Sequence, residues 1–320
     1  MADAAVVVPF LGPWESLIPL CDALEAQTAR SRLELVLSID GENTPPESIT
    51  HRFDRIVTGP RAGPAEARNR GWRATDSEFI LFTDGDCVPE PHWAHEMLKA
   101  LEGDCQAVKG VYSSGGVRLV QRLAQLEFQE RYVLMGKAAK LYLADTYSAG
   151  FRRGWLKELN GFDNSFPFPE HEDVDLSWRL ARAGGVIRFV PSARVAHSHR
   201  KTWRGYFRLK FRRGRWRVML LKRFPERTIR DGYTPQTLKL QMLLSPAVVL
   251  SLPFLHLSFA VPAISAGAFL LCTLPLVRVA LRHDPALAPI VPVFAFWRAM
   301  ALLSGSVTGI LSERHPCSRR

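Results

Sequence analysis

Acidic side chains with the spacing of a cation site follow one strongly apolar segment of this chain. Asp84 and Asp86 are separated by a single glycine, directly after the segment Phe-Ile-Leu-Phe at 79–82. The apolar segment predicts a buried strand, so the carboxylates should lie at its C-terminal end, where open α/β sheets bind their ligands. Two carboxylates so placed can share a hard divalent cation, Mg2+ or Mn2+, and bring a nucleotide diphosphate to it. Chemistry on a nucleotide-activated substrate is the leading interpretation.

A second acidic group lies about ninety residues further along the chain. Glu172 and Asp173 are adjacent, and Asp175 follows closely. Neighbouring like charges can raise the pKa of Asp173, which helps a carboxylate to accept a proton near neutral pH. The same acids would also suit the start of a helix, where the macrodipole favours negative charge. His197 follows a strand-like run a little further on, where a structural role competes with a role as a metal ligand.

The elements that must position these residues alternate between strands and helices. Apolar runs predict strands, and leucines at helical spacing predict a helix between the first two of them. The predicted strands cover residues 5–9, 33–39, 55–58, 79–82 and 186–190. Further helices are predicted over 89–101, over 117–142, and from the second acidic group to the glycines at 184–185. This order indicates an α/β protein with a Rossmann-like, parallel sheet.

Seven short motifs in one order now carry a resemblance. Each is weak alone, and together they extend over about residues 5–200. They are Val6-Val7-Val8-Pro9; Asp40-Gly41; Ala67-Arg68-Asn69-Arg70-Gly71; Thr83-Asp84-Gly85-Asp86; Gly150-Phe151-Arg152-Arg153 with Asn160-Gly161-Phe162-Asp163; Glu172-Asp173-Val174-Asp175-Leu176 with Arg179-Leu180; and His197. In this respect the chain resembles a family 2 glycosyltransferase with the GT-A fold, of the membrane-associated bacterial type.

The resemblance implies roles for individual residues. On the donor side it places Asp40 at the nucleobase, Arg68 near the diphosphate, Asp84 near the ribose and Asp86 on the metal, with Pro9 in the same donor-binding region. Asp84 and His197 are implied as further metal ligands, and His197 resembles a third ligand position.

On the acceptor side, the resemblance implies that Asp173 is the catalytic base, with Glu172 beside it. It also places Gly150 at the acceptor. A metal on the diphosphate would act as the electrophile, so an inverting transfer needs one protein base and no protein acid. The segment 212–216 resembles the QxxRW motif of processive polysaccharide synthases, with Arg212 in place of Gln, and makes Trp216 an acceptor-site candidate.

The net charge of +11 is concentrated in one segment. Residues 199–230 hold 13 Lys and Arg against one acid, and the segment from Gln241 to Val277 has no Asp, Glu, Lys or Arg. Aromatic residues among the cations would also suit nucleic acid. A basic segment that leads into an apolar one is more typical of an anionic membrane surface, so we expect no nucleic-acid partner.

The predicted organisation has three parts. Residues 1–198 form the catalytic domain, 199–237 a basic amphipathic interfacial segment, and 238–320 hydrophobic membrane helices. A hairpin over 242–281 would cross and return, in accord with the positive-inside rule. A third apolar helix over 286–311 carries Arg298 at its middle, which is costly inside a bilayer, so it should lie at the interface or pack on the hairpin.

The expected activity is the transfer of a sugar from a nucleotide-sugar donor to a lipid-linked or glycan acceptor at the cell inner membrane, with the catalytic domain in the cytoplasm. Alternatives remain open. They are a processive polysaccharide synthase, a nucleotidyltransferase on the same fold, a nucleic-acid-binding protein based on residues 199–230, and, for the apolar helices, the interior of a soluble domain.

Overall fold

The computed structural model describes residues 2–166 and 170–312. Within them the chain forms two compact units. The first, here called the sheet unit, comprises residues 2–115 and 138–198. The second, the helical unit, comprises residues 116–137 and 199–312. Each unit is described by itself below.

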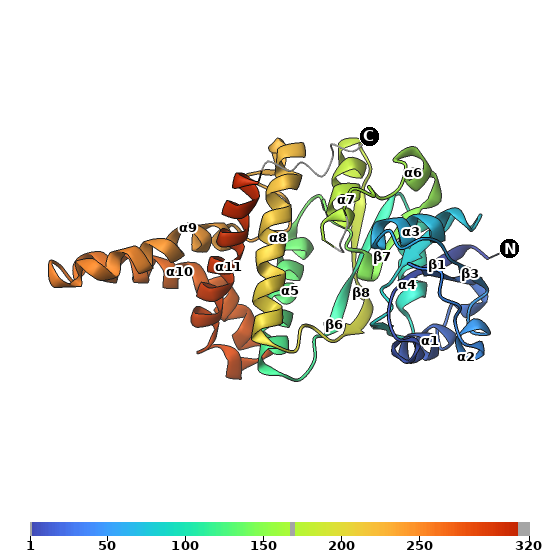
Figure 1. The fold of residues 1–320 in the computed structure, drawn as a ribbon, viewed down its shortest axis with the longest axis horizontal. Coiled ribbons are helices and arrows are strands. Elements are labelled where there is room, and N and C mark those ends of the chain that lie inside the picture. Colours follow the sequence, from blue (N-terminus) through green and yellow to red (C-terminus); the bar gives the residue numbers. More distant parts are fainter. Residues whose placement is uncertain (1, 167–169, 313–320) are drawn as a thin grey trace. The chain divides into compact units, whose positions relative to one another are not determined.

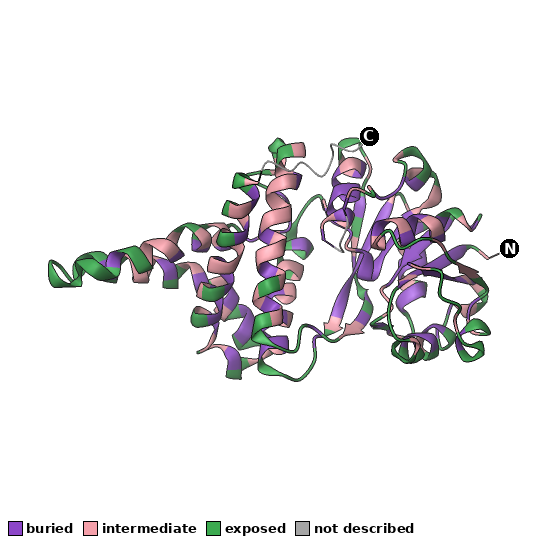
Figure 2. Cartoon of the chain, viewed as in Figure 1, coloured by how far each residue is buried: buried purple, intermediate pink, exposed green. Residues whose placement is uncertain are grey.

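One mixed sheet forms the core of the sheet unit (Figure 2). Strands β1, β2, β4 and β7 are almost entirely buried, whereas β3 and β8 are partly exposed. The strands are ordered β3-β2-β1-β4-β7-β6-β8-β5. Their bounds are β1 Ala4–Phe10, β2 Leu33–Ile39, β3 Arg55–Val57, β4 Phe79–Phe82, β5 Cys87–Pro89, β6 Ala107–Ser114, β7 Ala149–Arg152 and β8 Ile187–His197.

The prediction of a parallel sheet is correct for only part of it. Strands β3, β2, β1 and β4 are parallel, as the β-branched and apolar runs indicated. Strand β7 then pairs antiparallel to both β4 and β6, and β5 pairs antiparallel to β8. The correction has a physical cause: β7 contains Gly150 and β5 ends at Pro89, so neither has the continuous apolar run by which β4 was recognised.

Helices cover this sheet and connect its strands (Figure 1). The α-helices of the sheet unit are α1 Ile18–Glu25, α2 Glu47–Thr50, α3 Pro64–Arg73, α4 Trp93–Leu101, α6 Arg153–Glu158 and α7 Glu172–Arg182. Short 3-10 helices occur at η1 Trp14–Leu17, η2 Arg30–Arg32 and η3 Thr146–Ser148. Helix α3 packs very close to β1, because a Cβ at Gly71 would lie 2.3 Å from a methyl carbon of Val7.

The helical unit consists of long helices. They are α5 Leu119–Lys137, α8 Trp203–Arg223, α9 Gln236–Ser251, α10 Ala260–His283 and α11 Val291–Leu311, with 3-10 helices η4 Pro225–Arg227, η5 Leu252–His256 and η6 Pro285–Leu287. Helix α5 corrects the predicted division of the chain, which kept all residues up to 198 together. Its buried residues Val120, Leu123 and Leu126 share a core with α8, α10 and α11.

Three segments of the helical unit are long and apolar enough to cross a membrane: 236–256, 260–283 and 291–311. They correspond to the predicted hairpin and third helix. In the third, Arg298 is 1% exposed, and its Nη2 donates to Oε1 of Gln241 on α9 at 2.9 Å. Helix α11 therefore packs on α9, one of the two placements expected from its central arginine. The last eight residues, 313–320, lie outside the described part.

Candidate active site

The two aspartates after β4 lie at the C-terminal end of a fully buried strand, as predicted. Their side chains differ in surroundings. Asp86 has 68% of its side chain exposed. Asp84 turns toward Arg68, whose Nη2 donates to Asp84 Oδ1 at 2.9 Å. Of the two carboxylates, that of Asp86 is thus the more exposed at this edge.

Strand pairing brings His197 to Asp86. Residue Cys87 of β5 is the direct partner of His197, the last residue of β8, in the antiparallel ladder. Nδ1 of His197 consequently lies 3.5 Å from Oδ1 of Asp86. Burial alone would lower the pKa of His197, but hydrogen bonding and charge from Asp86, with the charge of Asp84, raise it. The predicted contact between these two candidate ligands is therefore present.

This group fits a hard divalent cation. Ligand atoms of Asp86, Cys87 and His197 lie within 4.8 Å of one another. Carboxylate oxygen and imidazole nitrogen both suit Mn2+. The thiol of Cys87 is buried, and that burial raises its pKa well above the usual value, so it stays protonated and is a poor ligand. Of the three predicted ligands, the structure brings Asp86 and His197 together and turns Asp84 to Arg68.

Arg68 joins the two acidic motifs. It is 3% exposed, and while its Nη2 binds Asp84, its Nη1 donates to Oε1 of Glu172 at 2.6 Å. Glu172 is also buried, which raises its pKa against the opposing charge of Arg68. Arg68 thus joins two distant parts of the chain, since Glu172 lies 104 residues after it and Asp84 only 16. The arginine expected near the diphosphate is at this edge, with two of its nitrogens already bound to carboxylates.

Asp173 is the second residue of α7, directly after Glu172. Its residue is partly buried. Burial, followed by the charges of Glu172 and Asp145, raises the pKa of Asp173 to about 8, although Arg68 acts in the opposite direction. The helix begins after His171, which has the left-handed φ of +72° that side chains other than glycine seldom adopt. The strained turn and the raised pKa fit a carboxylate held ready to accept a proton.

Asp175 and Arg179 together fasten α7 to the turn that precedes Phe162. Asp175 is fully buried and accepts a hydrogen bond from Nε of Arg179 at 2.7 Å. Arg179 also donates to the carbonyl oxygens of Leu159 and Gly161. Asp175 is thereby committed to structure, which leaves Asp173 as the acid of this helix available to a substrate.

Two donor-side candidates lie near the C-terminal ends of β1 and β2. Pro9 is the next-to-last residue of β1, and Asp40 follows β2. The carboxylate of Asp40 is already engaged: it accepts from the backbone N–H of Ala62 at 2.7 Å and of Gly63 at 3.0 and 3.1 Å. Asp40 therefore holds the loop that precedes α3. The resemblance implied a nucleobase contact for Asp40 but not this structural role.

The two acceptor-side candidates have different outcomes. Gly150 lies within β7, and a Cβ there would come within 3 Å of side-chain carbons of Leu81, Leu101 and Val108. The position is a packed core site, which corrects its assignment to the acceptor. Trp216 lies on α8, in the helical unit, and its role stays a prediction.

The sequence analysis did not predict a row of contacting side chains that leads from His197 to Asp145. Lys109 on β6 is fully buried, and its Nζ lies 3.4 Å from Asp145 Oδ2 and 3.6 Å from the ring centre of Tyr147. Tyr147 stacks on Tyr112, which in turn stacks on His197. These residues are scattered singly through the sequence. Only the fold reveals that they connect His197 to Asp145, whose charge acts on Asp173.

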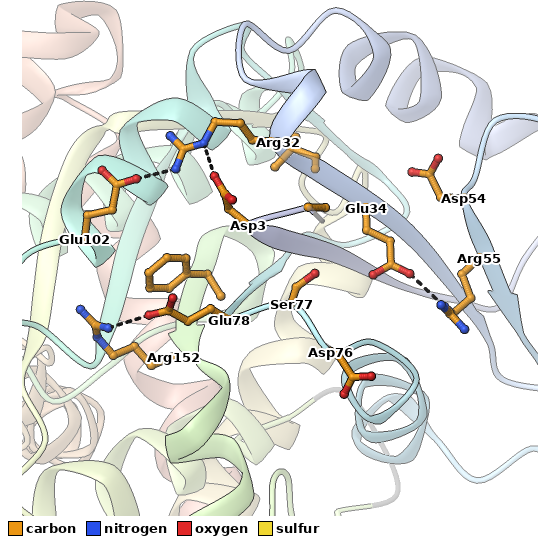
Figure 3. A pocket seen from close by; sticks show the side chains of 13 residues that line it. Asp3, Arg32, Glu34, Asp54, Arg55, Asp76, Ser77, Glu78, Glu102 and Arg152 are labelled. Atoms are coloured by element: carbon orange, nitrogen blue, oxygen red, sulfur yellow. Dashed lines mark hydrogen bonds and ion pairs between the residues drawn. The ribbon is translucent and has the colours of Figure 1, made fainter.

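The large hollow shown in Figure 3 lies elsewhere on the sheet unit, and it has a volume of about 890 Å3. It is lined by residues at the beginnings of β1, β2 and β4, the opposite ends of these strands from the site. Its charged side chains are already engaged in ion pairs. Arg32 pairs with Asp3 and Glu102, Arg55 with Glu34, and Arg152 with Glu78, while Asp54 and Asp76 pair with Arg30 and Arg153 outside the lining. We therefore do not assign the chemistry to this hollow.

The sheet and its edge define an α/β protein in which Arg68 links the acidic motif of a candidate cation site to the acidic start of α7. Comparison with known proteins agrees with this class. Residues 20–215 match the family described as "Glycosyltransferase like family 2". The match covers more than half of the chain, and the chain belongs to this family.

Individual relatives are distant. A pre-mycofactocin glycosyltransferase of Mycobacterium tuberculosis is 29% identical over 241 residues, which cover 71% of this chain and 49% of that protein. The probable glycosyltransferase YdaM of Bacillus subtilis is 25% identical over 207 residues, 58% of this chain and 47% of YdaM. The chain spans about half the length of these curated relatives.

A solved structure matches nearly the whole chain. The mannosyltransferase PcManGT from Pyrobaculum calidifontis, solved in complex with GDP-Man and Mn2+, aligns with a TM-score of 0.62 at 20% identity. The alignment covers 98% of this chain and 88% of that protein. The likeness confirms the GT-A fold.

Proposed function

We propose that the chain transfers a sugar, with inversion, from a nucleotide-sugar donor to a lipid-linked or glycan acceptor. One observation carries the proposal: the guanidinium of Arg68 binds Asp84 of the donor-side motif and Glu172 of the acceptor-side motif. Carboxylates suited to a metal and a carboxylate suited to a base thus belong to a single site. Membership of a glycosyltransferase family supports the reaction class.

On the donor side, Asp86 and His197 would hold a divalent cation, Mn2+ or Mg2+. When bound, such a cation neutralises the charge that develops on the departing nucleoside diphosphate. Asp86 offers its exposed carboxylate, and His197 is held beside it by the β5–β8 pairing. The presence of GDP-Man and Mn2+ in the solved PcManGT complex supports this choice of donor and cofactor.

On the acceptor side, Asp173 would take the proton of the attacking hydroxyl as that oxygen bonds to the anomeric carbon. A general base must be ionised to act and basic enough to receive the proton, and these needs are balanced when its pKa lies near the working pH. The raised pKa of Asp173 meets this condition. Glu172, held by Arg68, would fix the first turn of α7 and so aim Asp173.

Membrane attachment is the second part of the proposal. The helical unit combines nine Lys and Arg on α8 with three long apolar helices. Cations next to apolar helices favour an anionic bilayer surface. We place the enzyme at the cell inner membrane with the sheet unit in the cytoplasm, where nucleotide sugars and a lipid-borne hydroxyl would both be available.

A donor screen tests the reaction. The purified chain is incubated with a panel of nucleotide sugars and Mn2+, and the released nucleoside diphosphate is measured. We expect one donor to be hydrolysed or transferred, and the anomeric configuration of the product, read by NMR, to be opposite to that of the donor. Retention of configuration would contradict the assignment of Asp173, and release of pyrophosphate would instead indicate a nucleotidyltransferase.

A further inference from the structure

The helical unit exposes a long apolar hairpin. Helices α9 and α10, with η5 between them, extend away from α5, α8 and α11, and the end of this hairpin is exposed throughout (Figures 1 and 2). All ten residues from Leu252 to Val261 are exposed. Leu257 and Phe259 at the turn are 72% and 74% exposed. Such a surface needs a covering partner.

Protein packs against one face of the base of the hairpin, and only the outer part extends beyond these contacts. On α9, Gln241 and Ser245 are fully buried, and Gln241 binds Arg298 of α11. On α10, Phe269 is buried and meets Phe296 of α11. The free part thus extends from about Ser245 to the turn and back to Phe269.

The free part is too short to cross a bilayer. At about 1.5 Å per α-helical residue and about 2 Å per 3-10 residue, the 12 residues from Ser245 through the end of η5 extend roughly 20 Å, and ten residues of α10 roughly 15 Å. The hydrocarbon core of a bilayer is about 30 Å thick, so the uncovered hairpin reaches about the depth of one leaflet. A full crossing would draw the buried Arg298 and its partners into the hydrocarbon.

Helix α11 cannot cross either, although its composition would allow it. It runs alongside α8 over its whole length, from the contact between Tyr206 and Phe294 to that between Arg215 and Gly309. The two backbones nearly touch, since a Cβ at Gly305 would lie 1.9 Å from the carbonyl oxygen of Phe211. Both helices must therefore lie at the same depth, and the nine cations of α8 exclude the hydrocarbon core.

We propose that the α9–η5–α10 hairpin enters one leaflet of an anionic bilayer and returns without crossing it, while α8 and α11 lie at the surface of that leaflet. Arg278 and Arg282 follow the uncharged segment, are exposed, and would meet lipid phosphates at the level of the headgroups. The inference refines the membrane attachment proposed above, and it replaces the crossing hairpin that the sequence predicted.

Depth measurement tests the topology in the full-length protein. Cys272 and Cys317 are replaced by Ser, and an NBD label is placed at L257C in the turn or, as a shallow reference, at L243C on α9. Cys21, Cys87 and Cys105 are buried and should not react. The proteins are bound to phosphatidylcholine–phosphatidylglycerol vesicles whose acyl chains carry bromine at different depths.

We expect the label at 257 to be quenched most strongly by bromine near the ends of the acyl chains, and the label at 243 by bromine near the headgroups. Dithionite trapped inside the vesicles should leave the label at 257 intact. Reduction of that label by internal dithionite would show a crossing hairpin and overturn the inference, while leaving membrane attachment in place.

A charge substitution gives a second, independent measurement. L257E together with F259E should lower vesicle binding at least about 100-fold, because two large apolar side chains lose their burial and two charges are added. Release of nucleoside diphosphate from a soluble donor should not change. The matched control V186E, on an exposed apolar residue of the sheet unit, should bind vesicles normally.

Two results would reject the hairpin as a lipid-inserting element. One is vesicle binding by L257E/F259E equal to that of the unsubstituted chain. The other is light scattering that shows a dimer which these substitutions dissociate, since the hairpin would then be covered by a second copy. Loss of vesicle binding with retained transfer would leave the proposed chemistry standing, so the two proposals fail separately.

Discussion

At the scale of single residues, the proposed transfer depends most directly on Asp173. Replacing Asp173 with Asn keeps the size of the side chain and removes its basicity, so we expect transfer to fall about 10^3-fold with little change in donor affinity. Turnover and calorimetric titration with the donor measure the two quantities. Asp76→Asn, whose side chain is 96% exposed, is the control. An Asp173→Asn enzyme with normal turnover would rule out Asp173 as the base.

The pH dependence of stability gives Asp173 a test that needs no substrate. Its pKa is about 8 in the folded protein, because of burial and nearby acids, whereas the ordinary pKa of an aspartate is 3.8. The folded state therefore holds a proton that the unfolded state releases between pH 4 and 8, and stability from this group falls across that window. Relative to the unsubstituted chain, Asp173→Asn should gain thermal stability as the pH rises from 5 to 8, in metal-free buffer. A pH-independent difference in melting temperature would contradict the raised pKa.

Single substitutions of the candidate ligands test the proposed cation site. Asp86→Ala and His197→Ala should each weaken Mn2+ binding at least about 10-fold, since even changes to groups behind a ligand cost that much. Cys87→Ser, at the neighbouring buried thiol, should leave affinity unchanged because the protonated sulfur is not a ligand. Electron paramagnetic resonance of free Mn2+ measures the binding. If Cys87→Ser alone lost Mn2+ affinity strongly, Cys87 would be a ligand and the assignment of Asp86 and His197 would be wrong.

At the scale of elements, α3 connects the parts of the site. Asn69 is 1% exposed and bonds the backbone N–H and C=O of Phe162, the side chain of Asn164 and the indole of Trp72. Asn69→Ala would leave several buried groups unpaired, and we expect a loss of about 3 kcal/mol in stability. Asn164→Ala, at an exposed residue that loses only part of this network, should cost less than half as much. Thermal unfolding compares the two variants, and equal losses would refute the central role of Asn69.

The strands also show which parts of the fold could be predicted from the sequence. The strand 79–82 and the acids after it were predictable, because a continuous apolar run ended by Asp-Gly has few other interpretations. Strands β5 and β7 were not, because neither contains a continuous apolar run, and their antiparallel pairing depends on the whole sheet. For the same reason the partnership of Cys87 with His197 could not be derived, although the resemblance had indicated both Asp86 and His197.

Single polar residues were harder to interpret than motifs. Lys109 and Asp145 have no recognisable spacing, and an isolated lysine is usually solvated, so nothing in the sequence indicated their buried pair beside Tyr147. Gly150 belonged to a motif whose glycine has a packing cause that only the tertiary contacts reveal. Helix α5 was predicted correctly as a helix, but an amphipathic pattern does not specify which unit its apolar face contacts.

At the scale of the whole molecule, buried ions tie the helical unit together separately from the sheet. On α5, Glu127 accepts from Lys210 and Tyr206 of α8, and all three side chains are buried. Glu130, also on α5, lies 3.9 Å from Arg298 of α11. One polar cluster thus joins α5, α8, α9 and α11, and a defect in it should be felt throughout this unit.

The substitution Lys210→Met tests whether the helical unit can be destabilised without loosening the sheet unit. Removing Lys210 leaves Glu127 as a buried charge without its cation, which costs about 3–5 kcal/mol. In the full-length protein in detergent micelles, hydrogen exchange should accelerate in peptides from α5, α8 and α11, whereas peptides from β1, β2 and β4 should keep their protection. Lys222→Met, at an exposed position on the same helix, should alter neither set. Equal acceleration in the strands would mean that the two units unfold together, and that the helices support the catalytic sheet as well as its attachment to lipid.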